Sequence, residues 1–284
     1  MKVLDEFIEY LKNEEKSFNT IKGYVADLKD YFKWFQESFS KDFKILLRQN
    51  VLEYKSYLQN VRRNNAKTIN HKLSSLLKYN QYLVSKHIQD DIVIDPRDKI
   101  KIQLEYASPT KVTETEVKQF LQTVLESRNT RNYALMVLLA YTGIRISEAL
   151  NIRMDDFDLN GKECIIRSGK GDKQRSVILN GKVINALKEY LKNRENLSSA
   201  KESMYLFVSK KNKKLDRTTV NRIFQKYSDK ITPHQLRHFF CTNALEKGML
   251  THEVANQAGH SNIHTTLLYT NPDKKKLIKK MENL

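Results

Sequence analysis

Apolar residues recur every three or four positions along the first hundred residues, which is the spacing of amphipathic helices. From residue 17 to residue 35 they form one continuous stripe, made of Ile21, Tyr24, Val25, Leu28, Phe32 and Phe35. Ser17 precedes the stripe, and a serine hydroxyl there can accept a hydrogen bond from the first turn. The pattern therefore predicts a helix that begins after Ser17 and buries one face.

A second stripe runs from Asn65 to about Val84. Its apolar members are Ile69, Leu73, Leu76, Leu77 and Leu83. Basic residues occupy the other faces or come just before this segment: Arg62, Arg63, Lys67, Lys72 and Lys78. Such a helix can pack inward and present cations to phosphate, but a solvated charged face accounts for the same pattern equally well.

Between Asp90 and Lys111 the apolar periodicity lapses, and Pro96 and Pro109 interrupt a charged segment. This composition is typical of an extended connection. We therefore predict a helical domain over residues 1–95, a linker over 96–111 and a second domain over 112–284.

The second domain begins with a helix signal, because Thr113 and Glu116 have the spacing of a capping box. Residues 133–141 are almost wholly apolar and end at Thr142-Gly143, which predicts a buried helix that places Arg145 just beyond its end. Thr232-Pro233 and Gly248 mark the limits of another helix. That helix carries His234 and Arg237 three positions apart, and hence on one face.

Two short β-rich runs, ECIIR and RSVIL, lie between Glu163 and Leu179. They flank Gly169-Lys170-Gly171, so the segment is predicted to form a hairpin with Lys170 at its turn. The chain is therefore expected to be mainly α-helical with a small β-sheet.

Length and composition fit two folded domains: 284 residues, 40% of them hydrophobic, with 8 Gly and 4 Pro. No apolar run reaches 18 residues and the N-terminus has no signal-peptide pattern, so a cytoplasmic protein is expected. Cys164 and Cys241 lie far apart and without CxxC spacing, which predicts free thiols and no thiolate metal site.

The chain is strongly basic, with 50 Lys and Arg against 33 Asp and Glu, a formal charge of +17 and a pI near 9.6. Up to residue 111 the count is 20 basic minus 15 acidic, or +5, and beyond it 30 minus 18, or +12. A polyanion such as nucleic acid is the first candidate partner. The charge alone fits a lysine-rich protein that binds no nucleic acid just as well. The sequence motifs are therefore needed to distinguish the two.

Five short segments of the second domain occur in a fixed order: TGIRISEAL, SGKGDKQR, HQLRH, AGH and LLYT. Together they resemble the successive boxes of the tyrosine recombinase, or phage integrase, family. The resemblance spans about residues 112–272, and the helical front half resembles the core-binding domain of that family. It implies a two-domain clamp around double-stranded DNA, with a helical core-binding domain and a mixed α+β catalytic domain.

The resemblance also implies the chemistry, which is site-specific recombination through a 3′-phosphotyrosine. No metal or ATP is needed, and four protomers act on two DNA sites. Within this activity, resolution of transposon cointegrates is the expected role. Integration of a phage or mobile element and resolution of chromosome dimers are the alternatives, because one site chemistry serves all three.

The site residues carried over from the family are Arg145, Lys170, His234, Arg237, His260 and Tyr269. Arg145 and Arg237 match the phosphate-binding arginines, a role suited to a planar guanidinium that stays charged. Lys170 matches the general acid that protonates the leaving 5′ oxygen, with Lys173 and Arg175 as rivals for that role. His234 and His260 match the histidines that orient the phosphate and share in proton transfer.

Tyr269 matches the nucleophile, and its spacing after His260 distinguishes it from the other tyrosines among the 14 in the chain. The DNA-contacting residues expected alongside the catalytic set are Arg62, Arg63, Lys67, Lys72, Lys78, Lys173 and Arg175.

Some residues of the catalytic set also fit a simpler role. Arg145 has the spacing of a surface ion pair with Glu148, an acidic residue that otherwise braces it. His234 and His238 lie four apart, which also suits zinc, although the glutamate of an HExxH motif is missing. Two rival functions follow: a DNA-binding protein without catalysis, and a metal-dependent nuclease.

The chain departs from the family pattern at two positions beside the site. Ala258 precedes Gly259 where leucine is more frequent, and Cys241 replaces a small alanine. The lysine-rich tail KKKLIKK is expected to form a helix that docks on a neighbouring protomer, because Leu277 and Ile278 give it an apolar pair.

Overall fold

The structure is a computed structural model that describes residues 2–101, 112–167, 174–209, 214–260, 264–267 and 282. The chain divides into two compact units, Met1–Glu105 and Tyr106–Leu284, which are described separately below. Lys170, Lys173, Tyr269 and the KKKLIKK tail lie outside the described residues. In the ranges given above, no helix is both long enough and apolar enough to cross a membrane.

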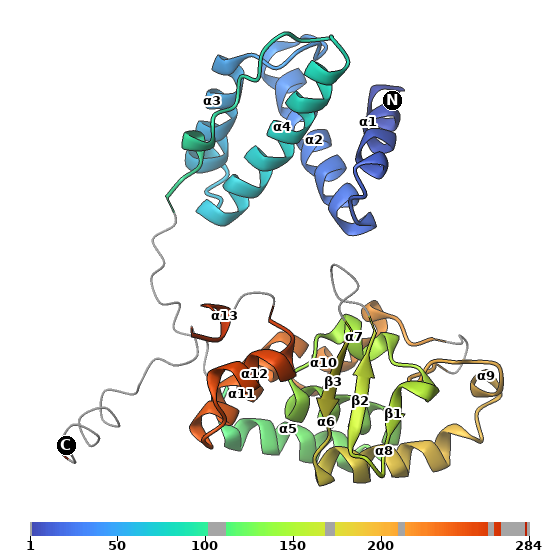
Figure 1. Ribbon diagram of the computed structural model, residues 1–284. Coiled ribbons are helices and arrows are strands. Elements are labelled where there is room, and N and C mark those ends of the chain that lie inside the picture. The colour runs from blue at the N-terminus through green and yellow to red at the C-terminus, as the bar shows by residue number, and fades with distance from the viewer. Residues whose placement is uncertain are drawn as a thin grey trace. The chain divides into compact units, whose positions relative to one another are not determined.

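The first unit is built from helices (Figure 1). They are α1 (Lys2–Asn13), α2 (Phe18–Phe39), α3 (Arg48–Ser56), a π-helical turn η1 (Tyr57–Val61), α4 (Ala66–Ser85) and a 3-10 turn η2 (Pro96–Asp98). The predicted helices after Ser17 and Asn65 are confirmed. Each begins at a side-chain cap, because the Ser17 hydroxyl accepts from the Thr20 amide and the Asn65 side chain accepts from the Thr68 amide.

Aromatic side chains fill the core of this unit between α2, α3 and α4. Tyr31 and Tyr54 are fully buried, and their rings meet edge to face at 5.0 Å. Trp34 lies 4.9 Å from the Tyr54 ring. The predicted stripe on α2 omitted Tyr31 and Trp34, which are more buried than Tyr24 and Val25. Tyrosine and tryptophan are ambiguous in a hydropathy pattern because each carries a polar atom on a large apolar ring.

The described part of the expected linker, residues 96–101, is fixed to the first unit. The Arg48 guanidinium forms a two-point ion pair with the buried carboxylate of Asp98, with 2.6 Å between Nη2 and Oδ1. The side-chain amide of Asn70 exchanges two hydrogen bonds of 2.8 Å with the main chain of Ile100. These contacts attach the segment to α3 and α4.

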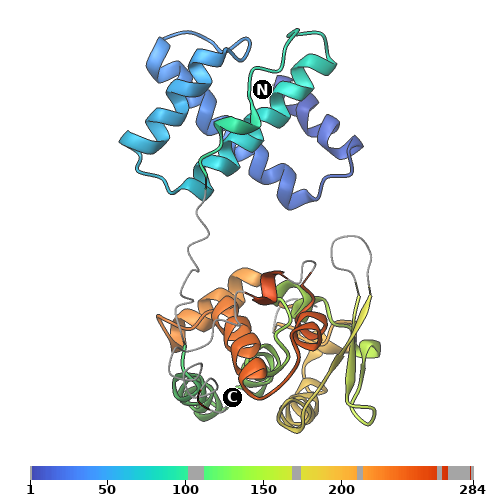
Figure 2. The ribbon, with the colours of Figure 1, turned by 60° about the vertical axis from the view of Figure 1, so that its left-hand side comes forward.

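The second unit combines helices with one small antiparallel sheet (Figures 1 and 2). The helices are α5 (Glu114–Glu126), α6 (Thr130–Thr142), α7 (Ile146–Asn151), α8 (Gly181–Arg194), α9 (Ser198–Lys201), α10 (Arg217–Tyr227), α11 (Pro233–Glu246), α12 (Thr251–Ala258) and α13 (His264–Leu267), with a 3-10 turn η3 (Met154–Asp156). The strands are β1 (Phe157–Asp158), β2 (Glu163–Ile166) and β3 (Arg175–Ile178), in the order β1-β2-β3. The mainly α fold with a small sheet is therefore confirmed.

Local signals set the boundaries of several of these elements. Thr113 and Glu116 form the predicted capping box at the start of α5. Thr232 caps α11, which starts at Pro233. β2 and β3 pair as predicted, with Ile166 opposite Arg175. The short strand β1, which pairs with β2, was not predicted.

Helix α6 is the centre of the second core and packs against α5, α8 and α11. It ends at Gly143, whose backbone is left-handed with φ +66°. A Cβ at this position would lie 2.2 Å from the Phe240 ring of α11, so no side chain fits there. Glycine thus allows α6 to end against α11, and the chain then turns directly into α7.

Candidate active site

Four segments that are distant in sequence meet at one place in the second unit. Arg145 is the N-cap residue of α7 and Arg175 opens β3. Arg237 lies on α11, and Ala258 is the last residue of α12, with Gly259 and His260 directly after it. The buried α6 and its left-handed C-cap at Gly143 determine where Arg145 begins α7.

Arg145 is held by Glu148 in two ways. Its amide donates to Glu148 Oε2 at 2.8 Å and its Nη1 donates to Oε1 at 3.0 Å. The side chain of Glu148 is 5% exposed, whereas that of Arg145 is 43% exposed. The predicted ion pair therefore exists, and it anchors one side of the guanidinium to a buried carboxylate while much of the group stays accessible.

Arg175, at the start of β3, binds the same carboxylate. Its Nη1 and Nη2 donate to the two oxygens of Glu148 at 3.1 and 2.9 Å. Nη2 also donates to the main-chain oxygen of Ala258 at 3.2 Å. The Arg175 side chain is 19% exposed. Arg175 was expected to contact DNA, and its pairing with Glu148 was not predicted. No local sequence signal links the two residues, because Glu148 lies 27 positions earlier.

Arg237 is buried and is held by main-chain oxygens. Its Nη1 donates to the carbonyl of Gly143 at 2.6 Å and to the carbonyl of Ala258. The second oxygen also accepts from Arg175. Arg145 and Arg237 therefore belong to one bonded framework, connected through Glu148, Arg175 and the Ala258 carbonyl.

Gly259 makes room for this framework. Its backbone is left-handed, with φ +73°, and an added Cβ would lie 2.3 Å from Cζ of Arg175. A side chain at this position would displace the guanidinium. The glycine of the AGH segment is thus required by the close approach of β3 to the end of α12.

The charge of the cluster favours an anion. Burial acts to raise the pKa of Glu148, but hydrogen bonds from Arg175 and the Arg145 amide, with the charges of both arginines, lower it below its ordinary value. The Glu148 carboxylate contacts the guanidinium groups of Arg145 and Arg175, and Arg237 adds a third guanidinium to the framework through the Ala258 carbonyl. A phosphate diester carries the complementary charge.

The histidines at the site are partly buried or paired. Burial lowers the pKa of His260 to about 4, and the charges of Arg237 and Arg145 add to the effect. Its Nδ1 lies 2.6 Å from the hydroxyl of Thr266 on α13. His260 is therefore neutral at pH 7 in the DNA-free protein, and acts there as a neutral hydrogen-bonding group.

His234 and His238 lie side by side on α11, with 3.0 Å between their Nε2 atoms. Burial lowers the pKa of His238 to about 4, and His234 and Arg237 also contribute. His238 thus contacts His234 directly. In the described part of the chain, no three His, Cys, Asp or Glu side chains gather as a metal site.

Tyr269 and Lys170 lie outside the described residues, but each is close in sequence to an element that the structure describes. Lys170 belongs to the connection between β2 and β3. Tyr269 comes three residues after Thr266, which contacts His260. The two cysteines are buried and free.

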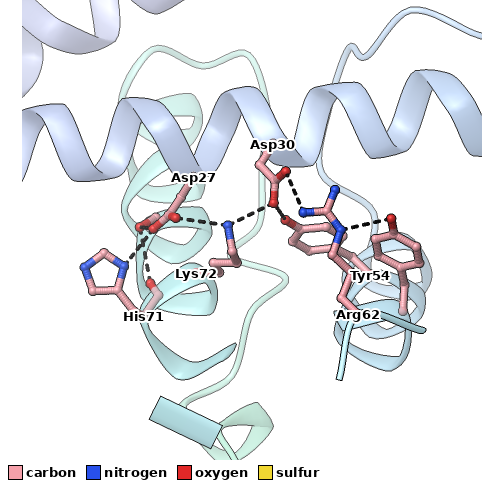
Figure 3. Close-up of polar contacts among 8 residues, drawn as sticks. Asp27, Asp30, Tyr54, Arg62, His71 and Lys72 are labelled. Carbon is pink, nitrogen blue, oxygen red and sulfur yellow. Dashed lines mark hydrogen bonds and ion pairs between the residues drawn. The ribbon is translucent and has the colours of Figure 1, made fainter. Parts of the chain in front are cut away.

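Basic residues of the first unit differ in how far acidic partners engage them (Figure 3). Lys72 donates to Asp27 at 3.2 Å and to Asp30 at 2.9 Å. Arg62 donates to Asp30 at 3.3 Å and to the hydroxyl of Tyr57 at 3.1 Å. This network connects α2 to α4 and η1, so the positive charge of Lys72 is balanced inside the unit.

Three other cations of the first unit were expected to contact DNA. Lys78 bonds Glu14 at 2.6 Å and is mostly covered. Arg63 and Lys67 are exposed and form no ion pair with any described residue. Their charges are thus the more available for a phosphate.

Comparison with known proteins places these features in a family. Residues 110–276 match the phage integrase family, and residues 4–87 match the phage integrase N-terminal SAM-like domain. TnP I resolvase of Bacillus thuringiensis is 61% identical over 284 residues, covering all of both chains. The tyrosine recombinase XerA of Pyrococcus furiosus is 32% identical over 99% of this chain and 93% of its own.

Solved structures agree with this relationship. The site-specific recombinase XerH, bound to a palindromic difH substrate in a post-cleavage complex, is 25% identical with a TM-score of 0.74, covering 92% of this chain and 78% of that one. The Tn1549 transposon integrase in complex with a circular intermediate DNA shares the fold, with a TM-score of 0.73 over 99% of this chain and 98% of its own, at 19% identity. The two-part helical architecture, the arginine framework and these relatives agree: the chain belongs to the phage integrase family of tyrosine recombinases.

Proposed function

We propose that this protein is a site-specific DNA recombinase that cleaves and rejoins strands through a 3′-phosphotyrosine on Tyr269. The observation that carries the proposal is the convergence of Arg145 and Arg237 on one framework built around Glu148 and the Ala258 carbonyl. That framework suits a phosphodiester, and the family supplies the reaction.

In this proposal Arg145 and Arg237 bind the non-bridging oxygens of the scissile phosphate. Negative charge grows on those oxygens as the pentacoordinate transition state forms, so fixed donors stabilise it more than the ground state. Removing one such donor costs roughly a factor of 10² to 10³ in rate in comparable oxyanion sites. His260 and His234 act as hydrogen-bonding partners of the same phosphate.

Tyr269 attacks phosphorus and Lys170 protonates the leaving 5′ oxygen. An unperturbed phenol has a pKa of about 10, so only about 0.1% is ionised at neutral pH, and the neighbouring cations favour the phenolate. The bond formed to the tyrosine replaces the bond broken in DNA. Rejoining therefore needs no ATP, and neither step needs a metal.

The expected role is resolution of transposon cointegrates. The full-length similarity to TnP I resolvase supports it. Integration of a mobile element and resolution of chromosome dimers use the same site chemistry and are the alternatives. We further propose that the protein acts in the cytoplasm, as a tetramer on two double-stranded sites.

A nicked duplex that traps the covalent product tests the chemistry. The native chain is expected to form a covalent protein–DNA adduct in excess EDTA, Tyr269→Phe to form none, and Tyr227→Phe, a partly buried tyrosine of the same unit, to form it normally. Adducts that persist in Tyr269→Phe identify a wrong nucleophile. Loss of cleavage in EDTA supports the metal-dependent nuclease, and DNA binding without any adduct supports the non-catalytic protein.

A plasmid bearing two directly repeated candidate sites from the genetic neighbourhood of the protein tests the role. Deletion between direct repeats on one plasmid, with little fusion of separate plasmids, is the expected outcome for a resolvase. Efficient fusion of two plasmids indicates an integrase instead.

A further inference from the structure

Arg175 occupies a position inside the arginine framework that no expected role explains. Its two terminal nitrogens bond both oxygens of Glu148, and one of them also bonds the Ala258 carbonyl. Glu148 in turn holds Arg145, and the Ala258 carbonyl also holds Arg237. Arg175 is thus one bond removed from each of the two phosphate-binding arginines.

The geometry disfavours the two roles expected for this residue. Both terminal nitrogens already donate to protein oxygens, and only 19% of the side chain is exposed, so little of it is available to a DNA backbone. A guanidinium does not release its proton at physiological pH, so Arg175 is also unsuited to act as the general acid.

A bidentate arginine–carboxylate pair fixes orientation as well as distance. Glu148 accepts from Arg145 and Arg175 at once, and each of its oxygens receives two hydrogen bonds. Without Arg175, the buried carboxylate of Glu148 loses the bidentate pair that fixes its orientation. Glu148 can then rotate, and the Arg145 guanidinium that it holds can move with it. A displacement of about 1 Å in a reacting group can cost roughly 10²-fold in rate.

We infer that Arg175 is a positioning residue: it locks Glu148 and the Ala258 carbonyl, and so aligns Arg145 and Arg237 on the scissile phosphate. The inference rests on the proposed recombinase function. It goes beyond that function by giving Arg175 a role in aligning the phosphate-binding arginines. This role is distinct from proton donation, which the proposed function assigns to Lys170.

The test compares three trapping duplexes that differ only at the scissile linkage. The first carries the natural phosphodiester, and the second a methylphosphonate, which lacks one negative charge and so depends less on aligned arginines. In the third, sulfur replaces the 5′ bridging oxygen, and its thiolate leaves without a proton donor. Arg175→Lys keeps the charge but cannot form the bidentate pair. Arg145→Lys and Lys170→Ala are the reference variants.

Arg175→Lys is expected to slow cleavage of the phosphodiester by about tenfold to a hundredfold. On the methylphosphonate the loss should shrink to less than about threefold, as for Arg145→Lys, because the charge to be stabilised is smaller. The 5′-sulfur duplex should restore the cleavage rate of Lys170→Ala, whereas Arg175→Lys should still cleave it slowly. In a Glu148→Gln background, Arg175→Lys should add little, because both changes break the same pair.

Three results would overturn the inference. Rescue of Arg175→Lys by the 5′-sulfur duplex would assign the residue to proton donation. An equal loss on all three duplexes, with a lowered thermal midpoint, would mean a structural role only, and unchanged cleavage of the phosphodiester would mean no role. If the native chain forms no adduct with the phosphodiester, it is the recombinase function itself that fails.

Discussion

The hydroxyl of Thr266 lies 2.6 Å from Nδ1 of His260, and Thr266 is fully buried. This contact connects the end of α12 to α13, three residues before Tyr269. The imidazole is neutral at pH 7 in the DNA-free protein, and the hydroxyl can pair with it either by donating to a bare Nδ1 or by accepting from Nδ1–H. One hydrogen bond thus connects the His260 ring to α13.

Thr266→Val is expected to slow single-turnover cleavage by about tenfold, the equivalent of one neutral hydrogen bond of about 1.4 kcal/mol. DNA affinity should stay unchanged, because the contact is internal. The exposed neighbour gives the control, and Thr265→Val should cleave normally. Equal rates for the two variants would show that the bond does not matter for cleavage.

Gly143→Ala should destabilise the second unit by about 2 kcal/mol or more, because the added carbon meets the Phe240 ring and the backbone is left-handed. Gly248→Ala is the matched control, since Gly248 also has positive φ, +95°, but has nothing within 4 Å of the added Cβ. It should cost only about 1 kcal/mol. Chemical denaturation followed by helical circular dichroism compares the two variants, and similar losses in both would contradict the packing explanation.

Acid should destabilise the DNA-free second unit through His238 and His260. Both have a folded-state pKa of about 4, below the ordinary 6.5. Between these values the unfolded chain binds more protons, so stability falls as pH drops from 6.5 towards 4. Thermal midpoints at pH 7, 6 and 5 should fall more steeply for the native chain than for His260→Gln. Parallel curves would contradict the low pKa of His260.

Tyr54 and Tyr31 form a natural pair for testing the network of Figure 3. The Tyr54 hydroxyl donates to Asp30 at 3.0 Å, whereas that of Tyr31 is buried and has no partner among the described residues. Tyr54→Phe should therefore lower the free energy of unfolding of the first unit by about 1–2 kcal/mol, and Tyr31→Phe should leave it unchanged or raise it.

Trp34 is the single tryptophan of the chain and contacts both tyrosine rings. Its fluorescence in a denaturant titration therefore follows the first unit within the whole protein. A larger loss in Tyr31→Phe than in Tyr54→Phe would contradict the assignment of these hydroxyls.

Salt dependence of duplex binding should separate the free and the engaged lysines of the first unit. Lys67→Ala is expected to reduce the slope of log K against log salt by about 1, because one phosphate contact is lost. Lys78→Ala should leave the slope unchanged, since Lys78 is bonded to Glu14. Fluorescence anisotropy across a salt series measures both slopes. The reverse order would place Lys78, rather than Lys67, against DNA.

Signals confined to a few residues predicted much of the fold. Ser17, Thr113 with Glu116, and Gly143 mark helix ends through bonds to the adjoining turn, and the β-rich runs ECIIR and RSVIL pair over four positions. The π-helical turn η1 and the two-residue strand β1 were not predicted, because neither is long enough to show a period.

The site was predicted less completely than the fold. Its ordered boxes indicate Arg145, Arg237 and the histidines, but two of the acceptors that hold Arg237 and Arg175 are peptide oxygens, which any residue supplies. Ion pairs between residues far apart in the sequence could not be predicted either. Lys72 is 42 and 45 positions from its carboxylates, so its own helix face predicts only exposure.

The Ala258 carbonyl has a consequence for how such sequences diverge. The oxygen that two arginines share belongs to the main chain, so exchanging alanine for the leucine more frequent in the family alters packing beneath α12 and keeps the acceptor. A change of side chain at this position therefore leaves the shared acceptor in the main chain. An insertion or deletion between residues 255 and 260 shifts the oxygen itself, and should be the rarer event among active homologues.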